Sequence, residues 1–384
     1  MIYLDNAATS FPKPPEVLAA MTHYATAVGA SPGRSGHQPA ANAGRLIFQA
    51  REQTAKLFNI NNSSRIIFTK NVTEALNLTI FGLVKPGDRI LTTAMEHNSV
   101  IRPLRYLEQE GRITLDIIPA TPTGEPDLEY LKQQLRKHSF QLAVLNHGSN
   151  ITGNIFPLAE TIPRLKAEGI TVIVDGAQTA GAVPIDLKTL DCDIFCFTGH
   201  KSLLGPQGTG GFVPREGLKP LPLTRGGTGS RSEAEYQPDF LPDYYESGTP
   251  NTIGLAGLAA ALKFINQTTV EEIHRHERKL TRKLWQGLAT ITGLRLYDPG
   301  ADQDRLPVIS FTMDKLTPAE ISFKLDREDE IMVRVGLHCA PLAHKTIGTF
   351  PQGTVRLAPG YFNTDREMET VIKTIEKMAA HSPT

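Results

Sequence analysis

Short apolar runs alternate with amphipathic stretches through most of the first 250 residues. The apolar runs have the length of strands and end in small or polar residues. They cover Arg65–Thr69, Arg89–Thr93, Leu142–Asn146, Thr171–Asp175, Asp193–Thr198 and Gly210–Val213. Helical patterns between them cover Glu74–Val84, Leu128–Lys137 and Ala159–Glu168. This alternation predicts an α/β fold whose mostly parallel sheet is covered by helices on both faces. Ligands of such sheets bind at the carboxyl edge, where strands end and loops begin.

The pattern changes in the second half of the chain. Gly226–Asp243 is rich in Gly, Ser, Glu, Pro and Tyr, which predicts a long irregular loop. A helix of small residues is predicted over Thr252–Ile265, a charged helix over Glu271–Ile291, and a strand over Leu306–Met313. The change of character places a domain boundary near residue 265, so residues 13–264 are predicted to form a large domain.

Composition narrows the class of protein. Of 384 residues, 40% are hydrophobic and 21% are charged, which is typical of a folded globular chain. Forty basic and forty acidic side chains cancel, so the charge gives no reason to expect nucleic-acid binding or an anionic membrane surface. The apolar stretches are far shorter than the roughly 18 residues of a membrane span, and MIYLDNAATS lacks the pattern of a signal peptide. Three cysteines argue against a disulfide framework. We therefore expect a soluble cytoplasmic enzyme.

Two strand ends carry a lysine and an aspartate that suggest a specific chemistry as a pair. The segment VIVDGAQ ends a predicted strand at Asp175, and CFTGHKS ends another just before Lys201. Taken singly, such an aspartate is usually a cap or turn former and such a lysine a solvated charge. Together they suit pyridoxal 5′-phosphate, since an amine can bond to its aldehyde and a carboxylate keeps its pyridine nitrogen protonated. Lys201 is the candidate Schiff-base lysine, and Asp175 the candidate pyridinium partner.

A phosphate site is also predicted. The stretch FTKNVTEALNL is a strand that runs into a helix, so the free amides at the helix start can face an anion. Thr73, Thr198 and His200 can add hydrogen-bond donors for the anion. An ordinary helix cap is an equally good interpretation of Thr73. His97 follows a strand and can stack on a flat cofactor or serve as a structural hydrogen bonder. No Walker motif or Gly-x-Gly-x-x-Gly is present, which weakens the alternative of a nucleotide-binding protein.

The spacing of Cys192, Cys196 and His200 would align three metal ligands on a helix. The surrounding DCDIFCFTG alternates like a strand, so both cysteines are predicted to lie in the core, and no metal site is expected.

A series of motifs, in order along almost the whole chain, resembles the class V aminotransferase-type pyridoxal-phosphate enzymes. The likeness is greatest to cysteine desulfurases of the SufS-like, type II group. The motifs are YLDNAAT at 3–9, NVTEALN at 71–77, MEHNS at 95–99, NHGSNITG at 146–153, VDGAQTAG at 174–181, TGHKSLLGPQGTG at 198–210, ESGTPNT at 246–252, RVGLHCA at 334–340 and RLAPGYFNT at 356–364. The resemblance implies a fold-type I pyridoxal-phosphate enzyme, with a small α+β domain built from residues 1–12 and 265–384.

The resemblance also implies roles for single residues. Lys201 matches the Schiff-base lysine, Asp175 the pyridinium partner, His97 the stacking histidine and Gln178 the partner of the cofactor's phenolic oxygen. Thr73, Thr198 and His200 match phosphate contacts, with the backbone of Val72, while Thr249 matches a residue that reaches the phosphate of the neighbouring subunit in a homodimer. Asn150 and Arg356 match substrate contacts, and a guanidinium such as that of Arg356 can bind an α-carboxylate through two parallel hydrogen bonds. Arg334 is a further candidate substrate contact.

Cys339 matches the sulfur-accepting cysteine of the type II group, although a lone cysteine is more often a small buried hydrophobe. Arg334 and His338 are expected to favour its thiolate, and Gly336, Gly348 and Gly353 suggest a mobile loop. The expected activity converts L-cysteine to L-alanine and leaves a persulfide on Cys339 for an acceptor protein, in iron–sulfur cluster assembly or another sulfur pathway.

Two positions depart from the family pattern. Leu337 stands where the type II group usually has a second histidine, and Val72 in the phosphate loop offers only its backbone. The first departure keeps two related activities open, selenocysteine lyase and cyst(e)ine C–S lyase, which would use the same Lys201 and Asp175. A non-enzymatic scaffold protein is a third alternative, which the intact lysine–aspartate pair disfavours.

Overall fold

The computed structural model describes residues 1–33 and 36–380. A seven-stranded sheet forms its centre, in the order β2-β8-β7-β6-β5-β3-β4. The strands are β2 (Ile67–Thr69), β3 (Asp88–Thr93), β4 (Ile113–Ile118), β5 (Leu142–Asn146), β6 (Thr171–Asp175), β7 (Ile194–Thr198) and β8 (Gly210–Pro214). The pairs from β4 to β7 are parallel, and β8 runs antiparallel to both of its neighbours. The predicted α/β fold with a mostly parallel sheet is confirmed.

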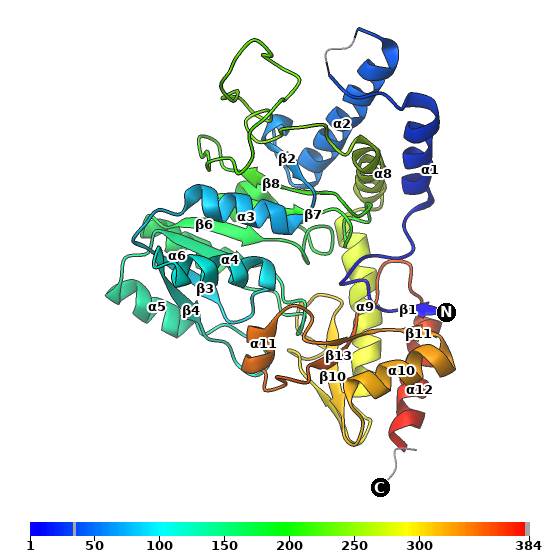
Figure 1. Ribbon diagram of the computed structural model, residues 1–384. Coiled ribbons are helices and arrows are strands. Elements are labelled where there is room, and N and C mark those ends of the chain that lie inside the picture. The colour runs from blue at the N-terminus through cyan, green and yellow to red at the C-terminus, as the bar shows by residue number, and fades with distance from the viewer. Residues whose placement is uncertain (34–35, 381–384) are drawn as a thin grey trace.

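Helices cover both faces of this sheet (Figure 1). The helices of this part of the chain are α1 (Pro15–His23), α2 (Gln38–Leu57), α3 (Val72–Leu83), α4 (Asn98–Gln109), α5 (Leu128–Lys137), α6 (Leu158–Ala167), α7 (Leu187–Leu190) and α8 (Thr252–Thr268), with a π-turn at Tyr24–Val28 and a 3₁₀ turn at Ser63–Arg65. One core cluster joins α2, α6 and α8 to the sheet, and another joins α3 and α4 to it. Within the described chain, residues 215–251 contain no helix or strand, as the loop prediction requires.

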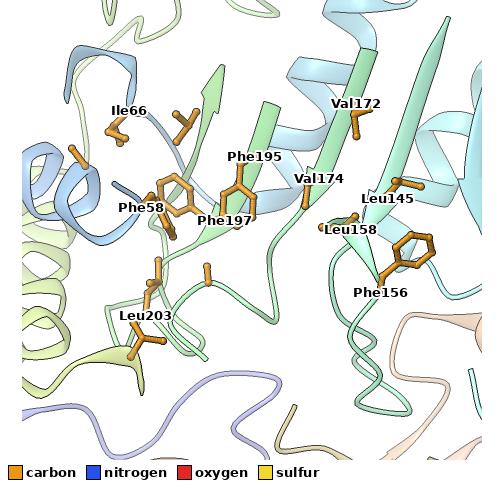
Figure 2. Close-up of a cluster of buried hydrophobic side chains, with 14 of the residues drawn as sticks. Phe58, Ile66, Leu145, Phe156, Leu158, Val172, Val174, Phe195, Phe197 and Leu203 are labelled. Atoms are coloured by element: carbon orange, nitrogen blue, oxygen red, sulfur yellow. The ribbon is translucent and has the colours of Figure 1, made fainter. Parts of the chain in front are cut away.

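Successive side chains along the central strands point to opposite faces of the sheet and so contribute to both core clusters. In β7, Phe195 and Phe197 pack in the α2–α6–α8 cluster, whereas Ile194 and Cys196 pack in the α3–α4 cluster. Figure 2 shows Phe195 and Phe197 against Phe58 at the end of α2. Cys196 is therefore a core residue, as predicted. Cys192, which was also predicted to lie in the core, is half-buried and packs against the α2–α6–α8 cluster.

The remaining elements form two small sheets (Figure 1). The antiparallel order β12-β13-β10-β9 joins β9 (Leu294–Leu296), β10 (Ile309–Met313), β12 (Arg334–Gly336) and β13 (Thr354–Leu357). A parallel pair joins β1 (Ile2–Tyr3) to β11 (Ile331–Met332), so the two ends of the sequence meet. The accompanying helices are α9 (Val270–Leu288), α10 (Pro318–Asp329), α11 (Pro341–Thr346) and α12 (Asp365–Ala380). This pairing is consistent with a small domain built from residues 1–12 and 265–384, whose exact limits stay a prediction.

Several boundaries differ from the sequence prediction by one to three residues. The strand predicted over Leu306–Met313 begins only at Ile309, because Leu306 and Val308 pack in a separate cluster with Ala182 and Val183. The charged helix ends at Leu288 rather than Ile291, where a turn follows. Among the described residues, no helix combines the length and the apolar composition needed to cross a bilayer.

Candidate active site

A cavity of about 260 Å³ lies at the carboxyl edge of the large sheet. Its walls come from the ends of β5, β6 and β7, the first turns of α3 and α4, and the sheet that contains β12 and β13. It brings together twelve of the thirteen predicted site residues. These are Val72, Thr73, His97, Asn150, Asp175, Gln178, Thr198, His200, Lys201, Arg334, Cys339 and Arg356. Residues from nearly the whole length of the sequence thus share one cavity.

Asp175 ends β6, directly beside Asn146 at the end of β5. Its side chain is buried, and its Oδ1 accepts a hydrogen bond from the backbone N–H of Ala177 at 2.9 Å. Burial raises the pKa of Asp175, while this hydrogen bond and the nearby Lys201 act in the opposite direction. A cation placed beside Asp175 in the cavity would therefore hold it as a carboxylate.

Lys201 follows β7 and projects its amine into the same cavity. The pKa of Lys201 is lowered to about 8, mainly by burial; Asp175 opposes this shift, and the guanidinium groups of Arg356 and Arg334 contribute to it. A larger share of this amine is neutral near neutral pH than for an ordinary lysine, and a neutral amine is the form that acts as a nucleophile or a base.

His97 lies at the start of α4 and caps that helix. Its Nδ1 accepts a hydrogen bond from the backbone N–H of Ser99 at 3.1 Å, which assigns the ring proton of the neutral tautomer to Nε2. Burial lowers the pKa of His97 to about 4, with a further contribution from Lys201, so the ring is neutral at physiological pH. A neutral, oriented imidazole therefore forms one wall of the cavity.

Donors for an anion gather at the start of α3. Asn71 caps this helix by accepting from the backbone N–H of Glu74 at 3.0 Å, and Val72 and Thr73 form its first turn at the cavity wall. His200 is neutral, since burial lowers its pKa to about 4, and its buried Nδ1 has no partner among the described residues. A helix start with free amides and an unsatisfied imidazole nitrogen form an anion-binding corner.

At the opposite side, a buried guanidinium is oriented by contacts that the sequence did not reveal. Arg356 Nη2 donates to Asp5 Oδ1 at 2.7 Å, and Arg356 Nη1 donates to the backbone oxygen of Asn150 at 3.1 Å. Arg334 lies 4.0 Å from the other oxygen of Asp5. Asp5 was not predicted as a site residue, because it is 351 positions from Arg356 and only folding brings β1 beside this region. Its motif, YLDNAAT, was the one available signal.

Cys339 is exposed at the mouth of this cavity, on the loop between β12 and α11. His338 and Cys339 have φ angles of 46° and 58°, a left-handed conformation that non-glycine residues rarely adopt. Two hydrogen bonds hold this turn, from Asn150 Nδ2 to the His338 oxygen at 2.9 Å and from the Asn98 N–H to the Cys339 oxygen at 2.7 Å. The loop thereby brings the Cys339 sulfur to the cavity that Lys201 and Asp175 line from the edge of the large sheet.

The expectation that His338 favours the Cys339 thiolate as a cation is wrong. Burial lowers the pKa of His338 to about 2, with further lowering by Arg356, so this imidazole is neutral at any physiological pH. The basic side chains that share the cavity with Cys339 are those of Lys201, Arg334 and Arg356, and Lys201 interacts electrostatically with Cys339.

Thr249 lies outside this cavity. It is exposed and lines a second hollow of about 320 Å³ with Phe68, Leu78, Leu223 and Tyr245, among others. Thr249 therefore does not contribute to the cavity that the other twelve predicted site residues line.

Comparison with known proteins places this geometry in a family. The Aminotransferase class-V model matches residues 2–371, and the chain belongs to that family. A probable cysteine desulfurase of Pyrococcus abyssi is 34% identical over 98% of this chain and 94% of its own length. One of Synechocystis sp. is 32% identical over 98% and 90%.

Solved structures give the same result. The apo structure of a cysteine desulfurase from Thermococcus onnurineus NA1 has a TM-score of 0.92 and 32% identity, over 99% of this chain and 94% of that one. The cysteine desulfurase CsdA from Escherichia coli has a TM-score of 0.88 and 26% identity, over 99% and 95%. The predicted fold-type I architecture is confirmed.

Enzymes of this family use pyridoxal 5′-phosphate, and the residues of the cavity fit that cofactor. The cofactor requires an amine for its aldehyde, a carboxylate for its ring nitrogen and donors for its phosphate. The cavity supplies Lys201 with a lowered pKa, the buried Asp175, and the helix start beside the unpartnered His200 Nδ1. Among the described residues, no group of three or more His, Cys, Asp or Glu side chains is placed to hold a metal ion.

Proposed function

We propose that this chain is a cysteine desulfurase, which converts L-cysteine to L-alanine and receives the sulfur on Cys339. The observation that carries the proposal is one cavity that holds the Lys201–Asp175 pair, a buried guanidinium and an exposed cysteine. The test is to supply the cofactor-loaded protein with L-cysteine and a reductant. Alanine and sulfide should appear in equal amounts, and sulfide with pyruvate in place of alanine would contradict the proposal.

Each wall of the cavity has a proposed role toward the cofactor. Lys201 would bond to its aldehyde, Asp175 would pair with its ring nitrogen, and His97 and Gln178 would contact its ring and phenolic oxygen. The amides of Val72 and Thr73, with Thr198 and His200, would bind the phosphate. When bound, the cofactor withdraws electrons from the α-carbon of an amino acid and so weakens the bonds around it.

Arg356 and Asn150, assisted by Arg334, are proposed to bind the α-carboxylate of the substrate. Asp5 holds Arg356 in place and balances part of the charge of the two guanidinium groups. A carboxylate that enters this region gains charge-assisted hydrogen bonds in a buried place, where they are stronger than in water. The amino acid is thus oriented with its α-carbon toward Lys201 and its side chain toward Cys339.

Arg356→Lys is expected to raise KM for L-cysteine about tenfold or more, with a smaller change in kcat. A lysine keeps the charge but loses the planar fork that binds a carboxylate, a loss of about 1.4 kcal/mol or more. Steady-state kinetics check this, with Arg164→Lys on the surface of α6 as the matched control. An unchanged KM would rule out the carboxylate role of Arg356.

Lys201 Nζ is proposed to accept the proton that the substrate loses from its α-carbon. The burial that lowers its pKa leaves a neutral amine at Nζ able to accept that proton. His97 Nε2, which carries the proton of the neutral ring, can pass a proton along the cavity wall.

The rate at which cofactor-free protein takes up pyridoxal phosphate should rise with pH and level off above about 8. Only the neutral amine bonds to an aldehyde, so the rate should fall about tenfold per pH unit below the lowered pKa of Lys201. Absorbance changes followed from pH 6 to 10 give the midpoint. The control variant is Lys13→Met. Burial also lowers the pKa of Lys13 to about 8, and Lys13 lies outside the cavity. A midpoint near the ordinary lysine value of 10.5 would contradict the assignment.

Cys339 is proposed to attack the substrate sulfur as a thiolate. The S–S bond forms as the C–S bond breaks, the carbon fragment keeps the electron pair and is protonated to alanine, and Cys339 retains the sulfur as a persulfide. The exposure of Cys339 allows a second molecule to approach that persulfide. We infer that a sulfur-acceptor protein or a thiol reductant removes it, in a reducing cytoplasm.

The working unit is proposed to be a homodimer. Thr249 lines a partly apolar hollow away from its own cavity, where a second subunit can meet it. Sedimentation should give about twice the 42.0 kDa mass of the chain, and a stable single chain with full activity would contradict the dimer.

A further inference from the structure

Glu96 lies in the loop between β3 and α4, between Met95 and His97, which both line the cavity. It is completely buried, one residue before His97. Its Oε1 lies 2.8 Å from Thr93 Oγ1 and accepts a hydrogen bond from the backbone N–H of Asn146 at 2.9 Å. Its Oε2 is also buried, and no residue that the structure describes gives it a hydrogen bond.

The contacts around Thr93 leave one hydrogen too few for an ionised Glu96. Thr93 Oγ1 lies 2.8 Å from Glu96 Oε1 and 3.0 Å from Asn146 Oδ1, and its hydroxyl has a single hydrogen. The orientation of the Asn146 amide is fixed, because its Nδ2 donates to the Met95 oxygen at 3.3 Å. With a carboxylate at Glu96, one of these two close oxygen–oxygen pairs would therefore have no hydrogen between its atoms.

We propose that Glu96 is a neutral carboxylic acid whose proton, on Oε1, starts a chain of hydrogen bonds that positions Asn146 in the cavity wall. Glu96 donates to Thr93 Oγ1, and Thr93 then donates to Asn146 Oδ1. In this arrangement Glu96 Oε1, Thr93 Oγ1 and Asn146 Oδ1 all have a partner. The remaining Oε2 is a carbonyl oxygen, and leaving it unpartnered costs less free energy than leaving a charged oxygen unpartnered in the same place.

This arrangement determines which of two neighbouring carboxyl groups, Glu96 or Asp175, carries the negative charge. Asn146 is paired in the sheet with Asp175, the charged group that faces Glu96 from β6. The pKa of Glu96 is raised to about 8, mainly by burial, with repulsion from Asp175 contributing and the hydrogen bonds from Asn146 and Thr93 opposing the rise. With Glu96 protonated, the negative charge of the pair lies on Asp175. Glu96 does not line the cavity and is a positioning residue. The effect of Glu96 on catalysis rests on the proposed function, whereas the protonation state of Glu96 does not depend on it.

Infrared spectroscopy of the holoenzyme at neutral pH tests the proposal. A neutral carboxylic acid has a C=O band, above the amide bands, that shifts in D₂O, and ¹³C labelling of the glutamate carboxyl groups assigns it to glutamate within the wild-type protein. The expected result is a labelled band that Glu96→Gln removes. If Glu96→Gln folds and every neutral-acid band remains, or if the wild type has none, Glu96 is ionised and the proposal is wrong.

Glu277 on α9 supplies the matched control, because it is also buried, has an Oε2 with no partner in the described chain, and has a pKa that burial raises to about 8. Glu277→Gln should leave the Glu96 band unchanged. Thr93→Val removes the acceptor of the Glu96 proton and should move its band to higher frequency, whereas Thr93→Ser should not. If the frequency of the Glu96 band does not change in Thr93→Val, the chain of hydrogen bonds is contradicted. These outcomes do not depend on which amino acid the enzyme consumes.

Discussion

Lys201→Ala is expected to lower alanine formation from L-cysteine by at least about 1,000-fold. The proposed function gives Lys201 two tasks, bonding to the cofactor and removing the α-proton, and general-base catalysis alone contributes about 10²–10⁴-fold. The measurement is alanine release under saturating L-cysteine, with the bound cofactor followed by its absorbance.

The same replacement at Lys13 is the control for this experiment. Lys13 has a similarly lowered pKa, and its amine donates to Ser10 Oγ and to the His200 oxygen, but it does not line the cavity. Lys13→Ala should keep most of the activity. If Lys201→Ala keeps a tenth or more of the wild-type rate, another amine performs the chemistry.

The second large effect is expected at Cys339. Cys339→Ala should reduce alanine formation from L-cysteine at least about 100-fold, because the nucleophile that accepts the sulfur is gone. Cofactor binding should be unchanged, since the proposed cofactor contacts come from other elements. Cys192→Ala is the matched control. Cys192 is half-buried, and burial raises the pKa of its thiol to about 12, so it supplies no thiolate at neutral pH.

This variant also separates the related activities. A selenocysteine lyase activity should survive in Cys339→Ala, because cleavage of the C–Se bond does not require a cysteine to accept the selenium. A C–S lyase would keep consuming L-cysteine in the same variant. Undiminished turnover of L-cysteine by Cys339→Ala would therefore overturn the persulfide proposal.

Buried strands were the part of the fold that the sequence predicted best. Leu142–Asn146 and Thr171–Asp175 match β5 and β6 at both ends, because a parallel strand buried on both faces is a continuous apolar run that stops at a polar residue. Ile113–Ile118 was not recognised, since β4 lies at the edge of the sheet and its middle residues are partly exposed. Its sequence, ITLDII, therefore has a polar centre.

Without the family resemblance, the site was predictable only where its functional residues lie close to a strand or helix end. Asp175, Lys201 and Thr73 carry such local signals. Asp5 and Glu96 do not, since their environments depend on strands that are distant in the sequence and on burial that no short pattern reveals. The state of His338 was mistaken for the same reason, because its charge depends on burial rather than on its neighbours in the sequence.

The account depends most on a covalent bond between Lys201 and pyridoxal phosphate. Borohydride reduction of the cofactor-loaded protein, followed by peptide mass analysis, makes that bond permanent and locates it. The account predicts one added pyridoxyl phosphate mass, on the peptide that contains Lys201. The mass on any other peptide, or on none, would contradict it.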